Sequence, residues 1–277
     1  MTSLPPLIES YVASIVEACA RPGSRAVSVI LFGSAVTGGY TSAISDVDLM
    51  IVLDDRATQE DRRRVRDMVD EIESRSGVTK QYPYRRGALN PIVDRITANV
   101  RSFFVCTRAD LISGDPARIL DITPAQAAFV DRVAVPSIVG SSRTAWGEDL
   151  LGQVHFQPIP RMDVAMAFFS LANQVGLTLV AYPFLPGATK YAMEALKRSI
   201  HNCYFCYHCR LAPLSEEVDF FQKRIGPNAA LAELMSLRAA YGPSVGFNLR
   251  CLPALVRLHL ATARDNRFPR DPRVRYS

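Results

Sequence analysis

Residues 32–48, Phe-Gly-Ser-Ala-Val-Thr-Gly-Gly-Tyr-Thr-Ser-Ala-Ile-Ser-Asp-Val-Asp, decide the fold of this chain. Gly33-Ser34 follows the apolar run 26–32, and Asp46 and Asp48 stand two residues apart just before a second apolar run. In a strand, side chains at i and i+2 share a face, so we expect the two carboxylates to point the same way. Such a pair suits a hard divalent cation that also binds phosphate oxygens. The stretch therefore indicates phosphoryl-transfer chemistry.

Gly33 and Ser34 have a separate part in this prediction. A glycine at the end of a strand lets backbone amides and the Ser34 hydroxyl approach a phosphate closely. The following Gly38-Gly39 belongs to neither a Walker A loop nor a dinucleotide fingerprint, because Gly-Lys-Ser/Thr and Gly-x-Gly-x-x-Gly are both missing. An aspartate-rich turn without catalytic meaning is the alternative for the same residues.

The order of these parts resembles the nucleotidyltransferase superfamily, which includes DNA polymerase beta and the aminoglycoside nucleotidyltransferases. The shared parts are a strand, Gly33-Ser34, a short helical turn, and Asp46-Val47-Asp48 opening a second strand. The resemblance implies a nucleotidyltransferase of the EC 2.7.7 type that binds an NTP, with ATP binding expected. By the same resemblance, Asp46 and Asp48 are the catalytic residues and bind two Mg²⁺ ions, while Gly33 and Ser34 hold the β- and γ-phosphates.

A third carboxylate on a later strand is usual in this superfamily, and here the pattern departs from it. The strand expected at residues 102–107 contains no acidic residue. Asp94 is the first candidate, by its distance from Asp48, although it equally fits a surface charge on a short helix. Asp110 is a further alternative, and so is the pair Glu148 and Asp149, for which a helix-capping role is the simpler interpretation.

The sequence predicts a domain boundary at Gln157-Pro158-Ile159-Pro160, because paired prolines interrupt both helices and strands. We therefore expect an α+β fold, with a minimal nucleotidyltransferase sheet and flanking helices in residues 1–158. A helical bundle is expected in residues 159–265 and a loose basic tail in 266–277. The periodicity predicts strands at 26–32, 47–53 and 102–107, and helices at 4–19, 58–76, 162–179, 189–210, 216–224, 228–241 and 251–264.

The amino-acid composition limits the classes of protein to which this chain can belong. The chain has 277 residues, of which 48% are hydrophobic and 21% charged, so it can bury a core and is not globally disordered. Its net charge of +5 fits an anionic substrate but does not separate a nucleotide from nucleic acid.

The location follows from two observations on the sequence. Residues 1–6 lack the layout of a signal peptide. Residues 164–189 contain no charged residue, and we interpret them as a buried helix and a turn rather than a membrane span. We expect a cytoplasmic protein without a membrane partner.

The helical half holds two unexplained patterns. Cys203, Cys206 and Cys209 share one helix face, which favours packing over the metal site that the flanking histidines suggest. Polar side chains also recur at helical spacing, and they either line one cleft or form a solvated face; they are Lys190, Glu194, Lys197 and His201.

The leading hypothesis is a Mg²⁺-dependent enzyme that moves a nucleoside monophosphate from an NTP to a hydroxyl of a small molecule and releases pyrophosphate. Its partners are then an NTP and a small-molecule acceptor. One alternative keeps the chemistry but uses a protein or an RNA 3′ end as acceptor, as in toxin–antitoxin nucleotidyltransferases. The other is a catalytically silent NTP-binding protein. The sequence identifies neither the acceptor, the base of the nucleotide nor the oligomeric state.

Overall fold

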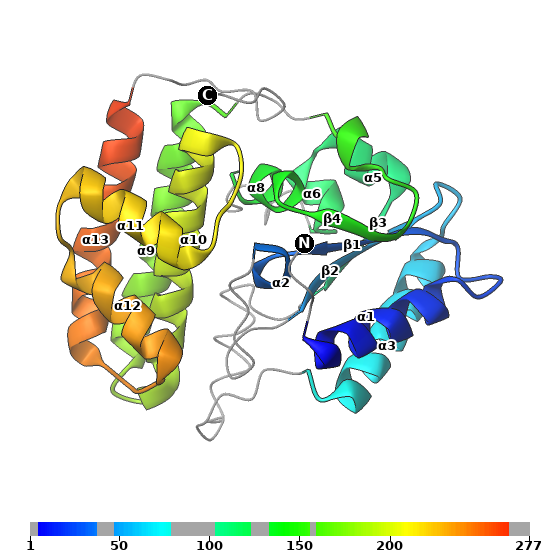
Figure 1. The fold of residues 1–277 in the computed structure, drawn as a ribbon, viewed down its shortest axis with the longest axis horizontal. Coiled ribbons are helices and arrows are strands. Elements are labelled where there is room, and N and C mark those ends of the chain that lie inside the picture. Colours follow the sequence, from blue (N-terminus) through cyan, green and yellow to red (C-terminus); the bar gives the residue numbers. More distant parts are fainter. Residues whose placement is uncertain (1–4, 38–46, 79–102, 123–132, 156–158, 266–277) are drawn as a thin grey trace. The chain divides into compact units, whose positions relative to one another are not determined.

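A computed structural model describes residues 5–37, 47–78, 103–122, 133–155 and 159–265. These residues form two compact units, each considered by itself. The first unit holds residues 5–37, 47–78, 103–122 and 138–155, and the second holds residues 133–137 and 159–265. A mixed sheet with flanking helices makes up the first unit and helices make up the second, which confirms the α+β fold class (Figure 1).

The sheet of the first unit has four strands in the order β3-β2-β1-β4. β1 (Ala26–Phe32) is antiparallel to β2 (Asp48–Leu53) and to β4 (Arg143–Gly147), whereas β3 (Phe103–Thr107) is parallel to β2. Phe32 at the end of β1 lies opposite Asp48 at the beginning of β2. The register therefore brings the two halves of the sequence motif to the same end of the sheet.

α1 (Pro6–Cys19) and α3 (Gln59–Ser76) pack together on one face of the sheet (Figure 1). Their apolar side chains form a buried cluster with alternate strand residues, among them Leu31 and Leu49. Because successive strand side chains alternate between faces, Asp48 belongs to the opposite face. The strand residues that follow Asp48 on that face, Met50 and Val52, are also buried, so the acidic motif begins at the end of a buried face.

Local signals fix the ends of α3 as the sequence predicts. Thr58 and Asp61 form a reciprocal capping box at its start, and Gly77 ends it with a φ of 71°.

The shorter elements are α2 (Ser34–Thr37), α5 (Arg108–Ser113), α6 (Pro116–Ile119), α8 (Ala134–Gly140) and η1 (Leu151–Gln153).

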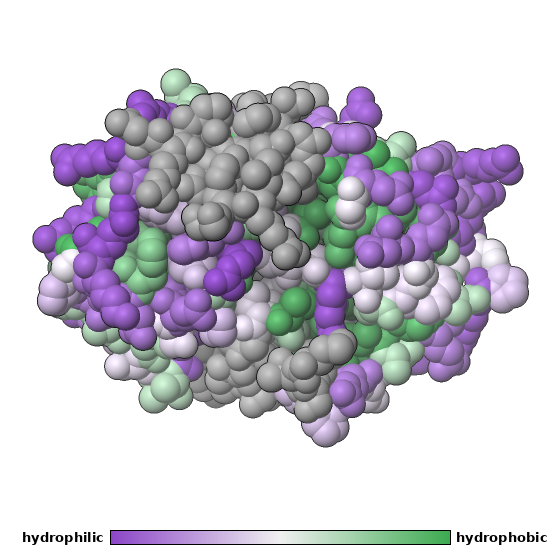
Figure 2. Space-filling view, turned by 45° about the horizontal axis from the view of Figure 1, so that its top comes forward, coloured by the Kyte–Doolittle hydropathy of each residue, from purple (hydrophilic) through white to green (hydrophobic). Residues whose placement is uncertain are grey.

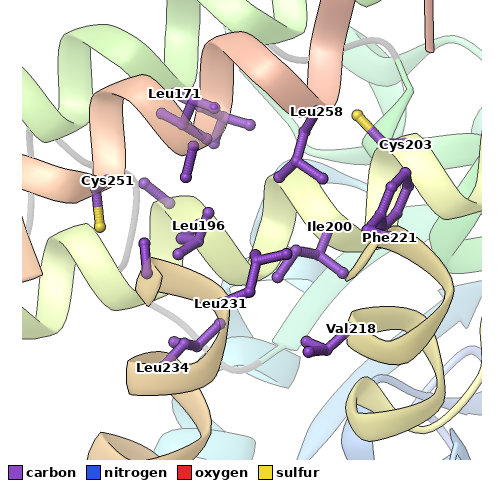
Figure 3. Close-up of a cluster of buried hydrophobic side chains, with 14 of the residues drawn as sticks. Leu171, Leu196, Ile200, Cys203, Val218, Phe221, Leu231, Leu234, Cys251 and Leu258 are labelled. Atoms are coloured by element: carbon purple, nitrogen blue, oxygen red, sulfur yellow. The ribbon is translucent and has the colours of Figure 1, made fainter. Parts of the chain in front are cut away.

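The second unit is built on three long helices that pack on one another: α9 (Arg161–Ala181), α10 (Thr189–His208) and α13 (Val245–Arg264). η2 (Pro186–Ala188) joins α9 to α10. α11 (Leu214–Ile225) and α12 (Ala229–Ala239) pack against α10 and α13. Figure 3 shows side chains from all five helices meeting in one cluster, including Leu171, Leu196, Phe221, Leu231 and Leu258. This cluster is the core of the helical unit.

A buried polar link also joins the three long helices. The Ser199 hydroxyl of α10 lies 2.8 Å from His259 Nε2 of α13, and His259 Nδ1 lies 3.1 Å from the Val164 carbonyl oxygen of α9. A carbonyl only accepts, so Nδ1 carries the proton and Nε2 accepts from Ser199. Burial lowers the pKa of His259 to about 4, which keeps the ring neutral near pH 7.

Three elements differ from the sequence-based expectation. α11 begins at Leu214, directly after Pro213 and two residues earlier than the expected start at residue 216. α13 begins at Val245 and continues through Pro253, because packing of the helix outweighs the one backbone hydrogen bond that proline removes. β4 was not expected, and it pairs with β1 along the edge of the sheet.

α9 is long and apolar enough to cross a membrane, by length and composition only, and is the one such helix among the residues described. A core helix of a soluble protein has the same composition. α9 buries Val164, Ala167, Leu171 and Val175, and it packs against α10 and α13. It is therefore a packed helix of the bundle in this structure.

Hydrophilic and hydrophobic residues are interspersed over the described surface on the face drawn in Figure 2. Most of the large hydrophobic side chains that the described residues expose belong to α9, to the turn after it, and to α13. Single exposed apolar residues are ordinary, but a group of them on one element is informative.

Candidate active site

The turn after β1 is formed by Gly33, whose φ of 71° favours glycine. Its carbonyl oxygen accepts hydrogen bonds from the backbone N–H groups of Val36 and Thr37, both at 3.1 Å. Ser34 is the first residue of α2 and is half-buried. The chain therefore turns sharply at Gly33 and directs the start of α2 away from the end of the strand.

Asp48 lies directly against this turn. A methyl group built on Gly33 would lie 2.2 Å from Asp48 Oδ2, 3.1 Å from its Cγ and 3.3 Å from its Cβ. At the first of these distances something must shift, so a side chain at position 33 would displace the Asp48 carboxylate from its place against the turn. The structure thus brings together Gly33, Ser34 and Asp48, three of the four residues predicted for the site.

Asp46 and Asp94 lie outside the described residues, so their predicted roles stay predictions. The described part of β3 offers no carboxylate to the face on which Asp48 lies. Its residues on that face are Phe104, opposite Met50, and Cys106, opposite Val52. Phe104 stacks on Phe32 of β1, with ring centroids 5.8 Å apart. An aromatic pair therefore occupies this face beside the acidic motif.

Asp110 is committed to a structural role. Its Oδ2 accepts from the Thr107 backbone N–H at 3.1 Å and the Thr107 hydroxyl at 2.8 Å, forming a capping box for α5. Arg62 donates to the same oxygen at 2.6 Å. Burial raises the pKa of Asp110, but these hydrogen bonds outweigh it and hold the pKa below its usual value. Asp110 is therefore a helix cap rather than a third metal ligand.

Glu148 and Asp149 follow β4, which forms an edge of the sheet. The Glu148 N–H donates to the Val27 carbonyl oxygen at 2.9 Å, and Glu148 forms an ion pair with Arg108. Asp149 accepts from the Thr144 hydroxyl at 3.0 Å. Val27 is five residues before the end of β1, so about 17 Å of strand separates Glu148 from the Gly33 turn. Glu148 is therefore too far from Asp48 to complete the site. Asp149 stays a prediction, because the Thr144 hydroxyl that it binds belongs to the β4 residue opposite Ile30.

Tyr11 is a residue near the site that the sequence pattern did not single out. Its side chain is 1% exposed, and its hydroxyl has no hydrogen-bond partner among the described residues. Burial raises the pKa of Tyr11, and the charges of Glu73, Asp70 and Asp48 raise it further. The sequence signal was only a tyrosine on the apolar face of α1, which is also typical of an ordinary core residue.

The polar residues predicted on α10 are paired within the helical unit. Glu194 and Lys197 form an ion pair at 2.5 Å. His201 Nδ1 lies 2.6 Å from Oε2 of Glu217, a fully buried carboxylate whose other oxygen accepts from the Ala212 N–H at 3.0 Å. Lys190 is also buried. These contacts describe a structured, half-buried face rather than a fully solvated one.

The cysteines of α10 act as core residues. Cys203 and Cys206 are buried, and Cys209 is the C-terminal cap of the helix. No group of three or more His, Cys, Asp or Glu side chains among the described residues is arranged to hold a metal ion. Packing is therefore the role that this part of the structure supports for the two buried cysteines.

Comparison with known proteins agrees with the geometry. Residues 12–81 match the family model of the nucleotidyltransferase domain. Among solved structures, a similar chain is spectinomycin adenyltransferase AAD(9) from Enterococcus faecialis, crystallised with ATP and spectinomycin. The identity is 11%, the match covers 90% of this chain and 98% of that chain, and the TM-score is 0.52. No curated protein sequence matches.

The matched segment indicates the class: residues 12–81 of the chain match a nucleotidyltransferase domain, and they contain β1 and β2 of the sheet. The likeness to the spectinomycin adenyltransferase, at 11% identity, is a likeness of fold.

Proposed function

We propose that this protein transfers a nucleoside monophosphate from an NTP to a hydroxyl group of a small molecule. The acceptor oxygen forms a bond to the α-phosphorus, the bond from that phosphorus to the bridging oxygen breaks, and pyrophosphate leaves. The acceptor proton passes to solvent or to a base. The observation that carries the proposal is the Asp48 carboxylate packed against the Gly33 turn, within a nucleotidyltransferase fold.

Nucleotidyltransferases typically use a divalent metal, and the residues present fit one. Asp48 supplies hard oxygen donors, and the glycine at position 33 lets its carboxylate lie directly against the turn. We propose that Asp46 and Asp48 hold two Mg²⁺ ions, with Asp46 assigned from the sequence alone. When bound, Mg²⁺ stabilises the negative charge that develops on the phosphate oxygens.

The other predicted residues bind and orient the nucleotide in this proposal. Backbone N–H groups after Gly33 and the hydroxyl of Ser34 donate to the β- and γ-phosphates. The Gly33 turn fixes where Asp48 lies relative to those donors, because its backbone is in contact with the carboxylate. Orientation of this kind lowers the barrier by holding the reacting groups in one geometry.

A small molecule is the proposed acceptor because the similar adenyltransferase was crystallised with ATP and a small molecule, spectinomycin. ATP is accordingly the first nucleotide to test. A cytoplasmic location remains part of the proposal.

A catalytically silent nucleotide-binding protein is the second candidate, and one observation favours it. The described residues that neighbour Asp48 on its face of the sheet are apolar, and Phe104 stands on β3 where an acidic residue would serve as a base. In this case NTP and Mg²⁺ bind without turnover.

Labelled nucleotides test the proposal. The full chain is incubated with Mg²⁺ and ATP labelled at the α- or the γ-phosphate, with a panel of small hydroxyl compounds, tRNA or protein extract. We expect the α-label on a small molecule and the γ-label in pyrophosphate. Label on tRNA or protein would replace the small-molecule acceptor, and binding without release of pyrophosphate across the panel would support the silent alternative.

A further inference from the structure

The outward side chains of α9 form one continuous stripe. Met162, Met166, Phe169, Asn173 and Val180 are all exposed. Half-buried Gly176 completes the series, so that successive members are four, three, four, three and four residues apart. This alternation is the spacing of a seam along which one helix packs against another.

The opposite face of α9 is already used in the core of the helical unit. Val164, Ala167, Leu171 and Val175 are 3% exposed or less. The helix is therefore held in place by its own unit, and it presents a second apolar face that none of the described residues covers.

The exposed area is large for a monomer. The exposed fractions are 67% for Met162, 37% for Met166, 63% for Phe169, 73% for Val180 and 76% for Phe184 just after the helix. With roughly 200 Å² for a large side chain, these five expose about 600 Å². This reaches the upper end of the largest apolar patch on a typical monomer, about 300–600 Å². It also supplies most of the roughly 800 Å² per partner that a standard interface buries.

We propose that this stripe pairs with the same stripe of a second copy of the chain, antiparallel, around a two-fold axis at Asn173. In that register Met162 lies opposite Phe184 and Met166 opposite Val180. Phe169 falls opposite Leu177 and beside Gly176, where the absence of a side chain leaves space for the aromatic ring. An interface that matches itself in this way is the isologous type expected of a symmetric dimer.

Asn173 decides between a second copy and a lipid surface. At the two-fold axis, its side-chain amide meets the same amide of the partner, and two amides can donate to and accept from each other. In the hydrocarbon of a membrane, the same amide would lose its hydrogen bonds to water at a cost of several kcal/mol. A polar residue in the middle of the stripe therefore favours protein over lipid.

The test combines sedimentation with a cross-link. Analytical ultracentrifugation of the full chain should show a concentration-dependent dimer. Phe169→Glu should weaken the dimer at least about 100-fold, because it buries a charge without a partner in the interface. Leu7→Glu is the matched control, since Leu7 is apolar, 48% exposed and on α1. Val180→Glu repeats the test should Phe169→Glu unfold, as judged by circular dichroism.

Asn173→Cys tests the register. A cysteine at the two-fold axis faces its copy, so mild oxidation should give a disulfide-linked dimer. Leu7→Cys and the wild-type chain, whose native Cys209 is half-buried, should not cross-link. A wild-type chain that is monomeric at every concentration overturns the proposal. Binding to lipid vesicles that Phe169→Glu abolishes, without a dimer in solution, also overturns it and assigns the stripe to a membrane.

Discussion

Gly33→Ala is the most informative single substitution at the candidate site. The added methyl group would lie 2.2 Å from Asp48 Oδ2, whereas ordinary contacts of a Cβ atom lie at 3.4–4 Å. Asp48 must therefore move by about 1 Å or more, or the turn must open. Gly33 also has a φ of 71°, so alanine is strained there whatever the space.

The two effects have different sizes and different readouts. The backbone effect costs about 1–2 kcal/mol of folding free energy. In a chain of this size, that lowers the melting temperature by about 2–8 °C. Displacement of a reacting group by about 1 Å lowers the rate by about 100-fold. We therefore expect Gly33→Ala to lose about 100-fold in pyrophosphate release and to lose the Mg²⁺-dependent rise in melting temperature with ATP.

Gly77→Ala is the control. Gly77 has the same φ of 71°, but a methyl group there meets nothing within 4 Å. Gly77→Ala therefore has the strain of a positive φ but no clash with a neighbouring side chain. This variant should lower stability and leave nucleotide binding and turnover intact. Equal losses of nucleotide binding in the two variants would refute the argument that Gly33 acts by giving Asp48 its space.

The remaining predictions separate structural from catalytic acids and bases. Asp110→Asn should lower stability by about 1–3 kcal/mol through loss of the cap and the Arg62 pair, with turnover per folded molecule unchanged. Glu148→Gln should leave turnover unchanged and cost at most about 1 kcal/mol, because its ion pair is half-exposed. The pKa of His259 is lowered to about 4 when folded, against about 6.5 unfolded, so the unfolded chain binds the proton first as the pH falls. Urea unfolding should therefore show about 3 kcal/mol of stability lost between pH 6.5 and 4, and His259→Asn should flatten that dependence.

Sequence periodicity and local signals were enough to predict most of the longer helices and strands of the first unit. The apolar runs of β1 and β2 are buried along most of their length, and Thr58 and Gly77 mark the ends of α3 by their own chemistry. The motif also placed Gly33 and Asp48 together correctly, because an antiparallel pair joined by a connection brings the end of one strand to the start of the next.

The features that the sequence did not predict depend on tertiary contacts. β4 contains arginine and threonine on a half-exposed edge, so its pairing with β1 leaves no periodic signal. The same pairing carries Glu148 to the far end of β1, which spacing along the chain does not reveal. The sequence predicted a helix that begins at residue 251, but Phe247 and Asn248 before it are also fully buried, and α13 begins at Val245.

Nucleotide binding by an Asp48 variant tests the central claim most directly. Titration calorimetry of ATP, with and without Mg²⁺, would compare the wild-type chain with Asp48→Asn and with Asp67→Asn, an exposed acid of α3. We predict Mg²⁺-dependent ATP binding by the wild type and by Asp67→Asn, and its loss in Asp48→Asn together with pyrophosphate release. Mg²⁺-dependent binding and turnover by Asp48→Asn at the wild-type level would contradict the account.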